Sequence, residues 1–216
     1  MESQANNDPI DLDRILVLKF IAILLARGVF CQKMNLKCMW SLQYGINIVK
    51  ELMSRNKFTK IMKYLRFDNK QVRRNSVVSD KFVMIREVWE KFIENSSASY
   101  KPERNVTCDE QLLPSKSRCP FTQFMPNKLD KFGIKFWLLC EVKSKYICNC
   151  FPYVEADVDR PSNDLFGKYI VKNLMEPYFN RGYHVTMDNY FTSRNLGRQL
   201  LSKKTIILGT MRKNRK

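Results

Sequence analysis

The spacing of the apolar residues changes near residue 100, and this change limits what the chain can fold into. Before that point the apolar residues recur at intervals of three and four, the period of one helix face. Phe58, Ile61, Met62 and Leu65 form one such set. After it, apolar residues gather in short runs rich in β-branched and aromatic side chains, a pattern typical of strands. The sequence therefore predicts a helical region followed by a region built on a sheet.

Five strand-like runs follow residue 104, and two amphipathic segments lie among them. Residues 165–175 fall between the third and fourth runs, and residues 193–201 between the fourth and fifth. An amphipathic helix between strands buries its apolar face against the sheet. We therefore predict an α+β or α/β fold, with a mixed five-stranded sheet and flanking helices. The five runs are 106–108, 134–142, 146–154, 184–187 and 205–208.

A polar segment, residues 95–104, separates the two patterns. It contains a proline and shows little periodicity, as linkers do. We place a domain boundary at its end, with a helical domain over residues 1–103 and a sheet domain over residues 104–216. A chain of 216 residues is long enough for one sizeable core or two smaller ones.

The chain is strongly basic, with 38 Lys and Arg against 21 Asp and Glu and a formal net charge of +17. Such a charge favours an anionic partner, most often nucleic acid. The longest apolar stretch, Ile15 to Ala26, is interrupted by Lys19 and is well short of the roughly 20 apolar residues that a membrane span needs. We interpret it as a buried helix and expect no membrane partner. The N-terminus lacks a signal-peptide pattern, which indicates a reducing compartment.

The cysteines do not suggest a zinc site. The seven cysteines are an odd number, form no Cys-x-x-Cys pair and are accompanied by a single histidine, His184. We expect free thiols that pack as small apolar side chains, and no zinc.

Two aspartates, Asp109 and Asp188, each follow a strand-like run, and each is followed by another polar side chain. Functional groups collect at strand ends in α/β sheets, and Mg²⁺ prefers carboxylate oxygens. Taken alone, either aspartate also suits an exposed strand end or a helix cap. Together, in so basic a chain, they predict a magnesium site for phosphoryl transfer on nucleic acid.

Ten basic side chains are candidates for contact with the phosphate backbone of DNA. Three of them follow Asp109, and seven lie in the segment 194–216, which contains no acid. A solvated basic face without a ligand is the alternative interpretation. The run 212–216 is also a candidate nuclear-targeting signal, so we expect a nuclear protein, and a frayed basic terminus is the alternative interpretation of this run. The ten candidates are Lys128, Lys131, Lys135, Arg194, Arg198, Lys203, Lys204, Arg212, Lys213 and Arg215.

Several ordered segments closely resemble the piggyBac transposases and their domesticated derivatives. The resemblance is densest from Thr107 to Arg215, and looser matches extend back to Met53. The segments are Asp109-Glu-Gln-Leu-Leu-Pro-Ser-Lys-Ser-Arg-Cys-Pro-Phe121, Pro126-Asn-Lys128, Lys131-Phe-Gly-Ile-Lys135, Phe151-Pro-Tyr153, Met187-Asp-Asn-Tyr-Phe-Thr-Ser193 and Gly209-Thr-Met-Arg-Lys-Asn-Arg215.

The resemblance implies an RNase H-like catalytic domain, preceded by a helical region that takes part in dimerisation and in binding transposon ends. It places Asp109 and Asp188 at the first two of the family's three metal-binding aspartates. With Mg²⁺ bound, such a site activates a water or a 3′-hydroxyl for in-line attack on phosphorus. Relatives use this chemistry for excision through hairpin ends and for integration at TTAA.

The third aspartate of the family falls on a later helix, so the resemblance implies a truncated chain with two of the three ligands. Asp157, Asp159 and Asp164 precede Asp188 and do not suit the missing position. We therefore expect a transposase-derived DNA-binding protein that does not transpose DNA alone. Two alternatives stay open. The chain is a fragment of an active enzyme, or it is an interaction module that forms a homodimer or a heterodimer with a full-length relative.

Overall fold

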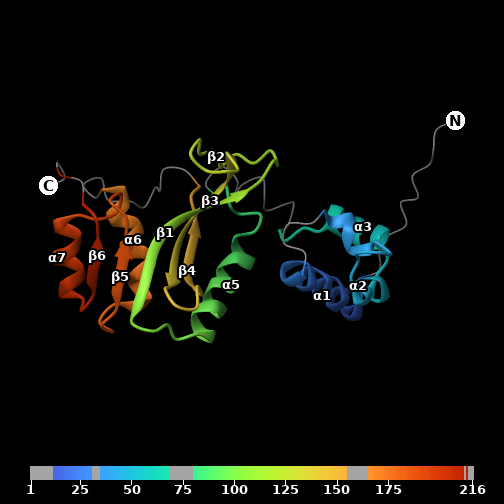
Figure 1. Ribbon diagram of the computed structural model, residues 1–216, viewed down its shortest axis with the longest axis horizontal. Coiled ribbons are helices and arrows are strands. Elements are labelled where there is room, and N and C mark those ends of the chain that lie inside the picture. Colours follow the sequence, from blue (N-terminus) through green and yellow to red (C-terminus); the bar gives the residue numbers. More distant parts are fainter. Residues whose placement is uncertain (1–11, 31–34, 69–79, 155–164, 212, 214–216) are drawn as a thin grey trace. The chain divides into compact units, whose positions relative to one another are not determined.

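The chain forms two compact units, residues 1–66 and 67–216, in a computed structural model (Figure 1). The division between these units lies ahead of the boundary that we placed at residue 103. The structure describes residues 12–30, 35–68, 80–154, 165–211 and 213.

The first unit packs its helices around one small core. A carboxylate oxygen of Asp13 accepts a hydrogen bond of 2.6 Å from the Leu16 N–H at the start of the first helix. Ser54 caps the third helix, on which the predicted face is confirmed at Phe58 and Ile61, because both are buried. The elements are α1 (Arg14–Phe30), the 3₁₀ helix η1 (Leu36–Trp40), α2 (Asn47–Leu52) and α3 (Arg55–Tyr64).

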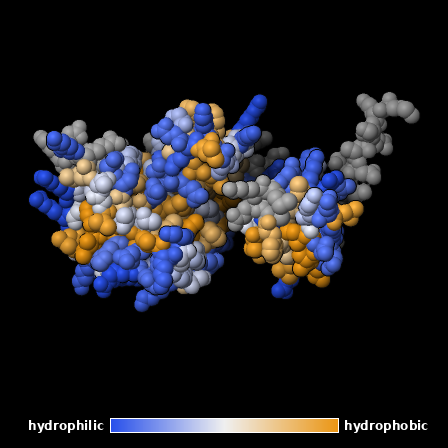
Figure 2. Space-filling model, viewed as in Figure 1, coloured by the Kyte–Doolittle hydropathy of each residue, from blue (hydrophilic) through white to orange (hydrophobic). Residues whose placement is uncertain are grey.

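Helix α1 is apolar on all sides, but the unit covers only one of them. Leu16, Phe20 and Ile23 belong to the core, whereas Leu18 and Leu25 on other sides are 56% and 66% exposed. Figure 2 shows hydrophobic surface where Figure 1 places α1. Our expectation of a buried helix is therefore correct for one side of α1 only. Among the described residues, no helix is long and apolar enough to span a membrane.

The second unit is built on a mixed sheet of six strands, in the order β2-β3-β1-β5-β6, with β4 also paired to β3. Strands β1 and β3 are antiparallel, whereas β5 runs parallel to both β1 and β6. We predicted five strands, and β2 was missed because its three residues are too few to show a period. The strands are β1 (Asn105–Pro114), β2 (Thr122–Phe124), β3 (Phe132–Glu141), β4 (Ile147–Pro152), β5 (His184–Met187) and β6 (Ile206–Gly209).

Helices cover both faces of this sheet. Neighbouring residues of a strand point to opposite faces, and in β3 the buried Trp137 and Phe136 meet different helices. The Trp137 ring lies 5.8 Å from Phe166 of α6 (Phe166–Met175), on the face that α7 (Arg194–Ser202) also covers. The Phe136 ring lies 4.9 Å from Trp89 on the other face.

Trp89 belongs to α5 (Arg86–Ser99), the helix that covers this second face. Ser96 and Ser97 of α5 donate hydrogen bonds of 3.1 and 2.6 Å to carbonyl oxygens of β4. We expected a linker from residue 95 and assigned everything before residue 104 to a helical domain. Residues 95–99 are instead the end of α5, because their serines bind the sheet.

Burial of the thiols leads to a labelling prediction. Burial raises the pKa of Cys148 to about 11 and that of Cys150 to about 12. It raises the pKa of Cys108 further still, helped by the negative charges of Asp109 and Asp188. A thiol that stays protonated is a poor nucleophile.

We expect a maleimide at pH of about 8 to leave these three thiols of the native protein unlabelled. Cys38 and Cys119 are partly exposed free thiols and should react, whereas Cys140 is also partly exposed but should react more slowly, because burial raises its pKa. Peptide mass spectrometry reads each site, and denatured protein, labelled throughout, is the control. Fast labelling of Cys108 in the native protein would contradict the burial that the structure shows.

Candidate metal and nucleic-acid site

The two candidate aspartates are neighbours across two parallel strands. Cys108 of β1 lies opposite Met187 of β5, and Asp109 and Asp188 are the next residues along each chain segment. Asp188 follows the end of β5, as predicted. Asp109 does not end a strand, because β1 continues to Pro114 through its pairing with β3. The fold therefore brings the two carboxylates to one place, where β5 ends alongside the middle of β1.

Both carboxylates are exposed, and each is fixed by one local hydrogen bond. One oxygen of Asp109 accepts from the Glu110 N–H at 2.8 Å. One oxygen of Asp188 accepts from the Tyr190 N–H at 2.9 Å. The second oxygen of each carboxylate has no hydrogen-bond partner within the part of the chain that the structure describes. Each aspartate can therefore offer an oxygen to a cation without losing its existing bond.

Hydrogen bonds at both ends fix the loop that follows Asp188. The carbonyl oxygen of Asp188 accepts hydrogen bonds from the Thr192 N–H at 3.2 Å and from its hydroxyl at 2.7 Å. Ser193 then caps α7 by accepting from the Leu196 N–H at 3.2 Å. In the sequence this loop was recognisable only as part of a family motif. Nothing in the sequence indicated that hydrogen bonds would hold the loop in place.

Gly209 of β6 packs closely against the same loop, and a substitution at this position tests that packing. A Cβ at this position would meet the carbonyl oxygen of Met187 and the hydroxyl of Thr192. We expect Gly209→Ala to lower the free energy of unfolding by about 1–3 kcal/mol, the usual cost of overpacking. Because the displaced groups hold Asp188, any Mg²⁺-dependent property should weaken as well.

Chemical denaturation followed by circular dichroism measures the stability change. Gly28→Ala is the matched control, because a Cβ there meets nothing within 4 Å and alanine favours the helix α1 by about 0.5–1 kcal/mol. If Gly209→Ala were as stable as the native chain, the close packing of β6 against the loop would be contradicted.

Two of the predicted basic residues lie on the opposite face from Asp109. Lys128 is 3.5 Å from a carboxylate oxygen of Glu110, and the Lys135 ammonium lies 3.9 Å from the centre of the Trp137 ring. Burial lowers the pKa of Lys135, and the nearby Glu110 carboxylate partly offsets this shift. Both side chains thus have a partner within the sheet unit.

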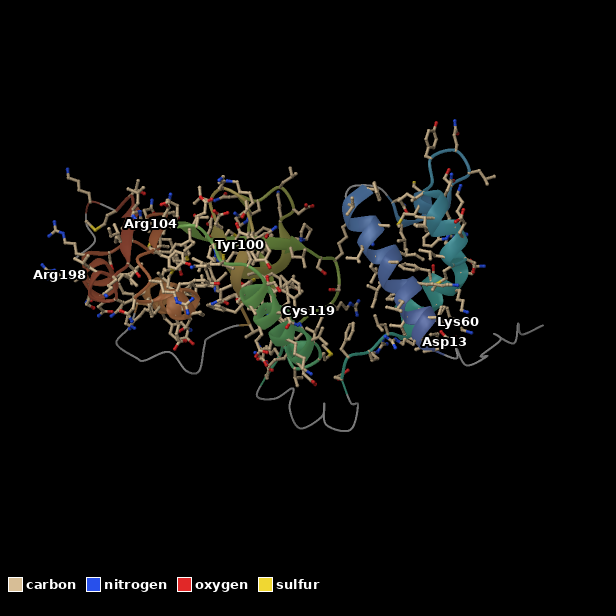
Figure 3. The ribbon with its side chains drawn as sticks, turned by 90° about the horizontal axis from the view of Figure 1, so that it is seen from below. Asp13, Lys60, Tyr100, Arg104, Cys119 and Arg198 are labelled. Atoms are coloured by element: carbon tan, nitrogen blue, oxygen red, sulfur yellow. The ribbon has the colours of Figure 1, made fainter. Side chains whose placement is uncertain are left out.

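Five of the remaining candidates are exposed. Arg194 and Arg198 lie one turn apart on α7, and Figure 3 shows Arg198 at the outer edge of this unit. Lys203 is half-buried, with its ammonium 3.9 Å from the centre of the Phe179 ring. Arg212 and Arg215 lie outside the described residues. The exposed candidates are Lys131, Arg194, Arg198, Lys204 and Lys213.

The carboxylate pair fits Mg²⁺ only in part. No group of three His, Cys, Asp or Glu side chains is placed to hold a metal ion among the residues that the structure describes. Mg²⁺, however, is often held by one or two carboxylates together with substrate phosphates and water. Asp109 and Asp188 supply that number of carboxylates. Asp157, Asp159 and Asp164 lie outside the described residues, and their exclusion as a third ligand stays a prediction.

Comparison with known proteins identifies the family. The family model described as Transposase IS4 matches residues 1–216, and the chain belongs to this family of transposases. It is of the piggyBac type. A piggyBac transposase in a synaptic complex with hairpin DNA, solved by cryo-EM, is 29% identical over 99% of this chain with a TM-score of 0.86. The likeness confirms the RNase H-like fold and the resemblance read from the sequence.

The same comparison limits what carries over to this chain. The match covers 46% of that transposase, so this chain spans less than half of its length. The Mos1 transposase paired-end complex with left transposon end is 13% identical over 96% of this chain and 61% of its own, with a TM-score of 0.28.

Proposed function

We propose that this chain is the DNA-binding part of a piggyBac-type transposase and that it binds DNA without cutting it. The observation that carries the proposal is the meeting of Asp109 and Asp188 on neighbouring parallel strands in a chain of net charge +17. Support comes from the similar transposase, whose complex contains hairpin DNA. Exposed basic side chains would hold the phosphate backbone, mainly Arg194 and Arg198.

Some residues of the site supply negative charge, and others orient the charged groups. Asp109 and Asp188 present free carboxylate oxygens, and the hydrogen bonds from Glu110 and Tyr190 fix their direction. Asp109 and Asp188 would hold Mg²⁺, which would supply Lewis acidity to the site. Without the third aspartate that the resemblance implies, transition-state stabilisation is lost, and each 1.4 kcal/mol lost slows chemistry about tenfold. Binding without cleavage follows.

Fluorescence anisotropy with a labelled duplex tests binding, and a denaturing gel tests cutting. We expect the chain to bind the duplex in EDTA and more tightly in Mg²⁺, with no nicked product. The double variant Asp109→Asn, Asp188→Asn should bind more tightly than the native chain in EDTA, because two negative charges near the phosphates are gone, and should lose the response to Mg²⁺. Lack of binding at low salt would overturn the proposal.

Mg²⁺-dependent nicking that Asp109→Ala abolishes would instead favour an active enzyme. The coverage of 46% of the similar transposase keeps this alternative open. Reading the genomic DNA beyond the codon for Lys216 tests it directly, since an in-frame continuation with an acidic helix would supply the third ligand.

A second candidate function is pairing with another copy or with a full-length relative. It is favoured by the uncovered side of α1, where Ile15, Leu18, Leu25 and Val29 are 56–71% exposed. Contiguous apolar surface of this kind marks interaction sites. Light scattering after size exclusion should show a dimer that Leu18→Glu with Leu25→Glu dissociates. A strict monomer with no affinity for a full-length relative would remove this candidate.

A further inference from the structure

Two phenylalanines form an exposed pair at one end of the sheet. Phe124 of β2 lies directly opposite Phe132 of β3, with ring centres 4.8 Å apart. Cross-strand aromatic pairs stabilise a hairpin, but here each side chain stays 57% exposed. Phe121, three residues before Phe124, is instead buried against Phe82. The pair thus presents ring surface that the described part of the chain leaves open.

The segment around this pair is basic. Residues 115–132 contain four basic side chains and one acid, Asp130. Lys116, Arg118 and Lys131 are exposed, and Lys128 is the one that approaches Glu110. Exposed rings among positive charges are the features by which proteins hold unpaired nucleotides, since bases stack on rings and phosphates meet cations. A basic or purely apolar partner would not match this combination.

The pair lies on the same face of the sheet as Asp109. Asp109 is opposite Leu138 in the β1–β3 register, and Phe132 is six residues from Leu138 along β3, so both point to one face. The Ser115 N–H donates to the Phe132 carbonyl oxygen at 3.2 Å. Along the direction of β1, the aromatic pair therefore lies six residues beyond Asp109. Six residues of strand correspond to about 20 Å.

The surface of β1 between the two points is open, while α5 covers Phe136 of β3 on the same face. Gln111 and Leu113 lie on the same face of β1 between Asp109 and the pair, and both are exposed. A span of about 20 Å corresponds to roughly six stacked nucleotides at 3.4 Å each. One strand of DNA can therefore pass along β1, beside α5, from the aspartates to the aromatic pair.

We propose that Phe124 and Phe132 form a stacking platform for an unpaired base of the DNA strand whose phosphates reach Asp109 and Asp188. The platform rests on the proposed function, because it presumes that DNA lies along the sheet. It adds a preference for single-stranded DNA, which backbone charge alone does not supply. The rings hold the base by their faces, and Lys131 beside Phe132 holds the adjoining phosphate.

The test compares a labelled single-stranded oligonucleotide of about 12 nucleotides with a duplex of the same length. The full chain should bind both. The double variant Phe124→Ala, Phe132→Ala should lose at least about fivefold in affinity for the single strand, the loss expected from one stacked base, and less than about twofold for the duplex. The salt dependence should not change, because no charge is removed.

Two controls separate stacking from damage to the fold. Phe132→Tyr keeps a ring and should keep single-strand binding. Phe92→Ala removes an aromatic side chain on α5 that is 55% exposed and should change neither affinity. A double variant that binds the single strand like the native chain, or loses both ligands equally, overturns the platform. A native chain that binds duplex alone also overturns it while the proposed function stands, and binding to neither overturns both.

Discussion

Replacing Trp137 with alanine should lower the free energy of unfolding of the sheet unit by about 3–5 kcal/mol, the usual loss for a buried aromatic side chain. Trp137 is 1% exposed. Its ring contacts four aromatic rings at centre distances of 5.7–6.2 Å, so truncation opens a cavity that these rigid neighbours cannot fill. The neighbours are Tyr153, Phe166, Tyr190 and Phe191.

The variant Trp137→Phe should cost much less than Trp137→Ala. It keeps a ring at the same place, and it removes the indole N–H, which is buried without a hydrogen-bond partner in the described structure. An unpaired buried donor carries a desolvation cost of about 1–3 kcal/mol, so its loss offsets part of the lost contact area. A Trp137→Phe variant as unstable as Trp137→Ala would contradict this reasoning.

Denaturation should be followed separately in the two units, because a chain of two units need not unfold in one step. Trp40→Ala is the matched control. Trp40 lies 5.3 Å from Phe58, and its indole N–H donates to the Met53 carbonyl oxygen at 2.8 Å, so its loss should destabilise residues 1–66 and spare the sheet. Hydrogen exchange by mass spectrometry resolves the units. An unchanged sheet transition in Trp137→Ala would refute the prediction.

The same substitution should also disturb the site. The Tyr190 ring stacks on Trp137 with an angle of 7° between the planes, and the Tyr190 N–H holds the Asp188 carboxylate. Loss of the indole removes this stacking contact of Tyr190, so Trp137→Ala should weaken the response of DNA binding to Mg²⁺ at temperatures where the variant is still folded. Trp137→Phe should retain more of that response, which links packing beneath the sheet to the carboxylate above it.

The sequence predicted those parts of the fold in which a local pattern is repeated. The faces of α6 and α7 and the positions of β3 and β5 each rest on several apolar residues at one period. β2 has three residues, too few to show a period, and the last turn of α5 consists of small polar residues, so the sequence predicted neither β2 nor the end of α5. The end of β1 was misplaced for another reason. Its pairing with β3 carries the strand through Asp109 and Glu110, and such pairing is not encoded locally.

The site shows the same contrast. The two aspartates were recognisable by their type and by their place after apolar runs, and the parallel pairing of β1 with β5 places them together. The engagement of Lys128 and Lys135 was not recognisable, because Glu110 and Trp137 reach them only across the sheet. Charge along the sequence therefore overstated the number of cations that are free to meet DNA.

The number of exposed basic candidates determines how strongly duplex binding depends on salt. We expect the duplex affinity to fall several hundred-fold between about 50 and 200 mM salt. Each phosphate contact contributes a slope of about −0.9 to the plot of log affinity against log salt. The five exposed candidates give a slope of about −4.5, and a fourfold rise in salt then weakens binding about 500-fold. They are Lys131, Arg194, Arg198, Lys204 and Lys213.

The double variant Arg194→Ala, Arg198→Ala should reduce the size of the slope by about 2, because two contacts are lost. Lys135→Ala should change it little, since that ammonium is half-buried over Trp137. Lys143→Ala is the control for an exposed lysine that is already paired, 3.0 Å from Glu103. If Lys135→Ala reduces the slope as much as the loss of an arginine, the ammonium must leave Trp137 to meet the phosphate, and the division between engaged and free cations is wrong.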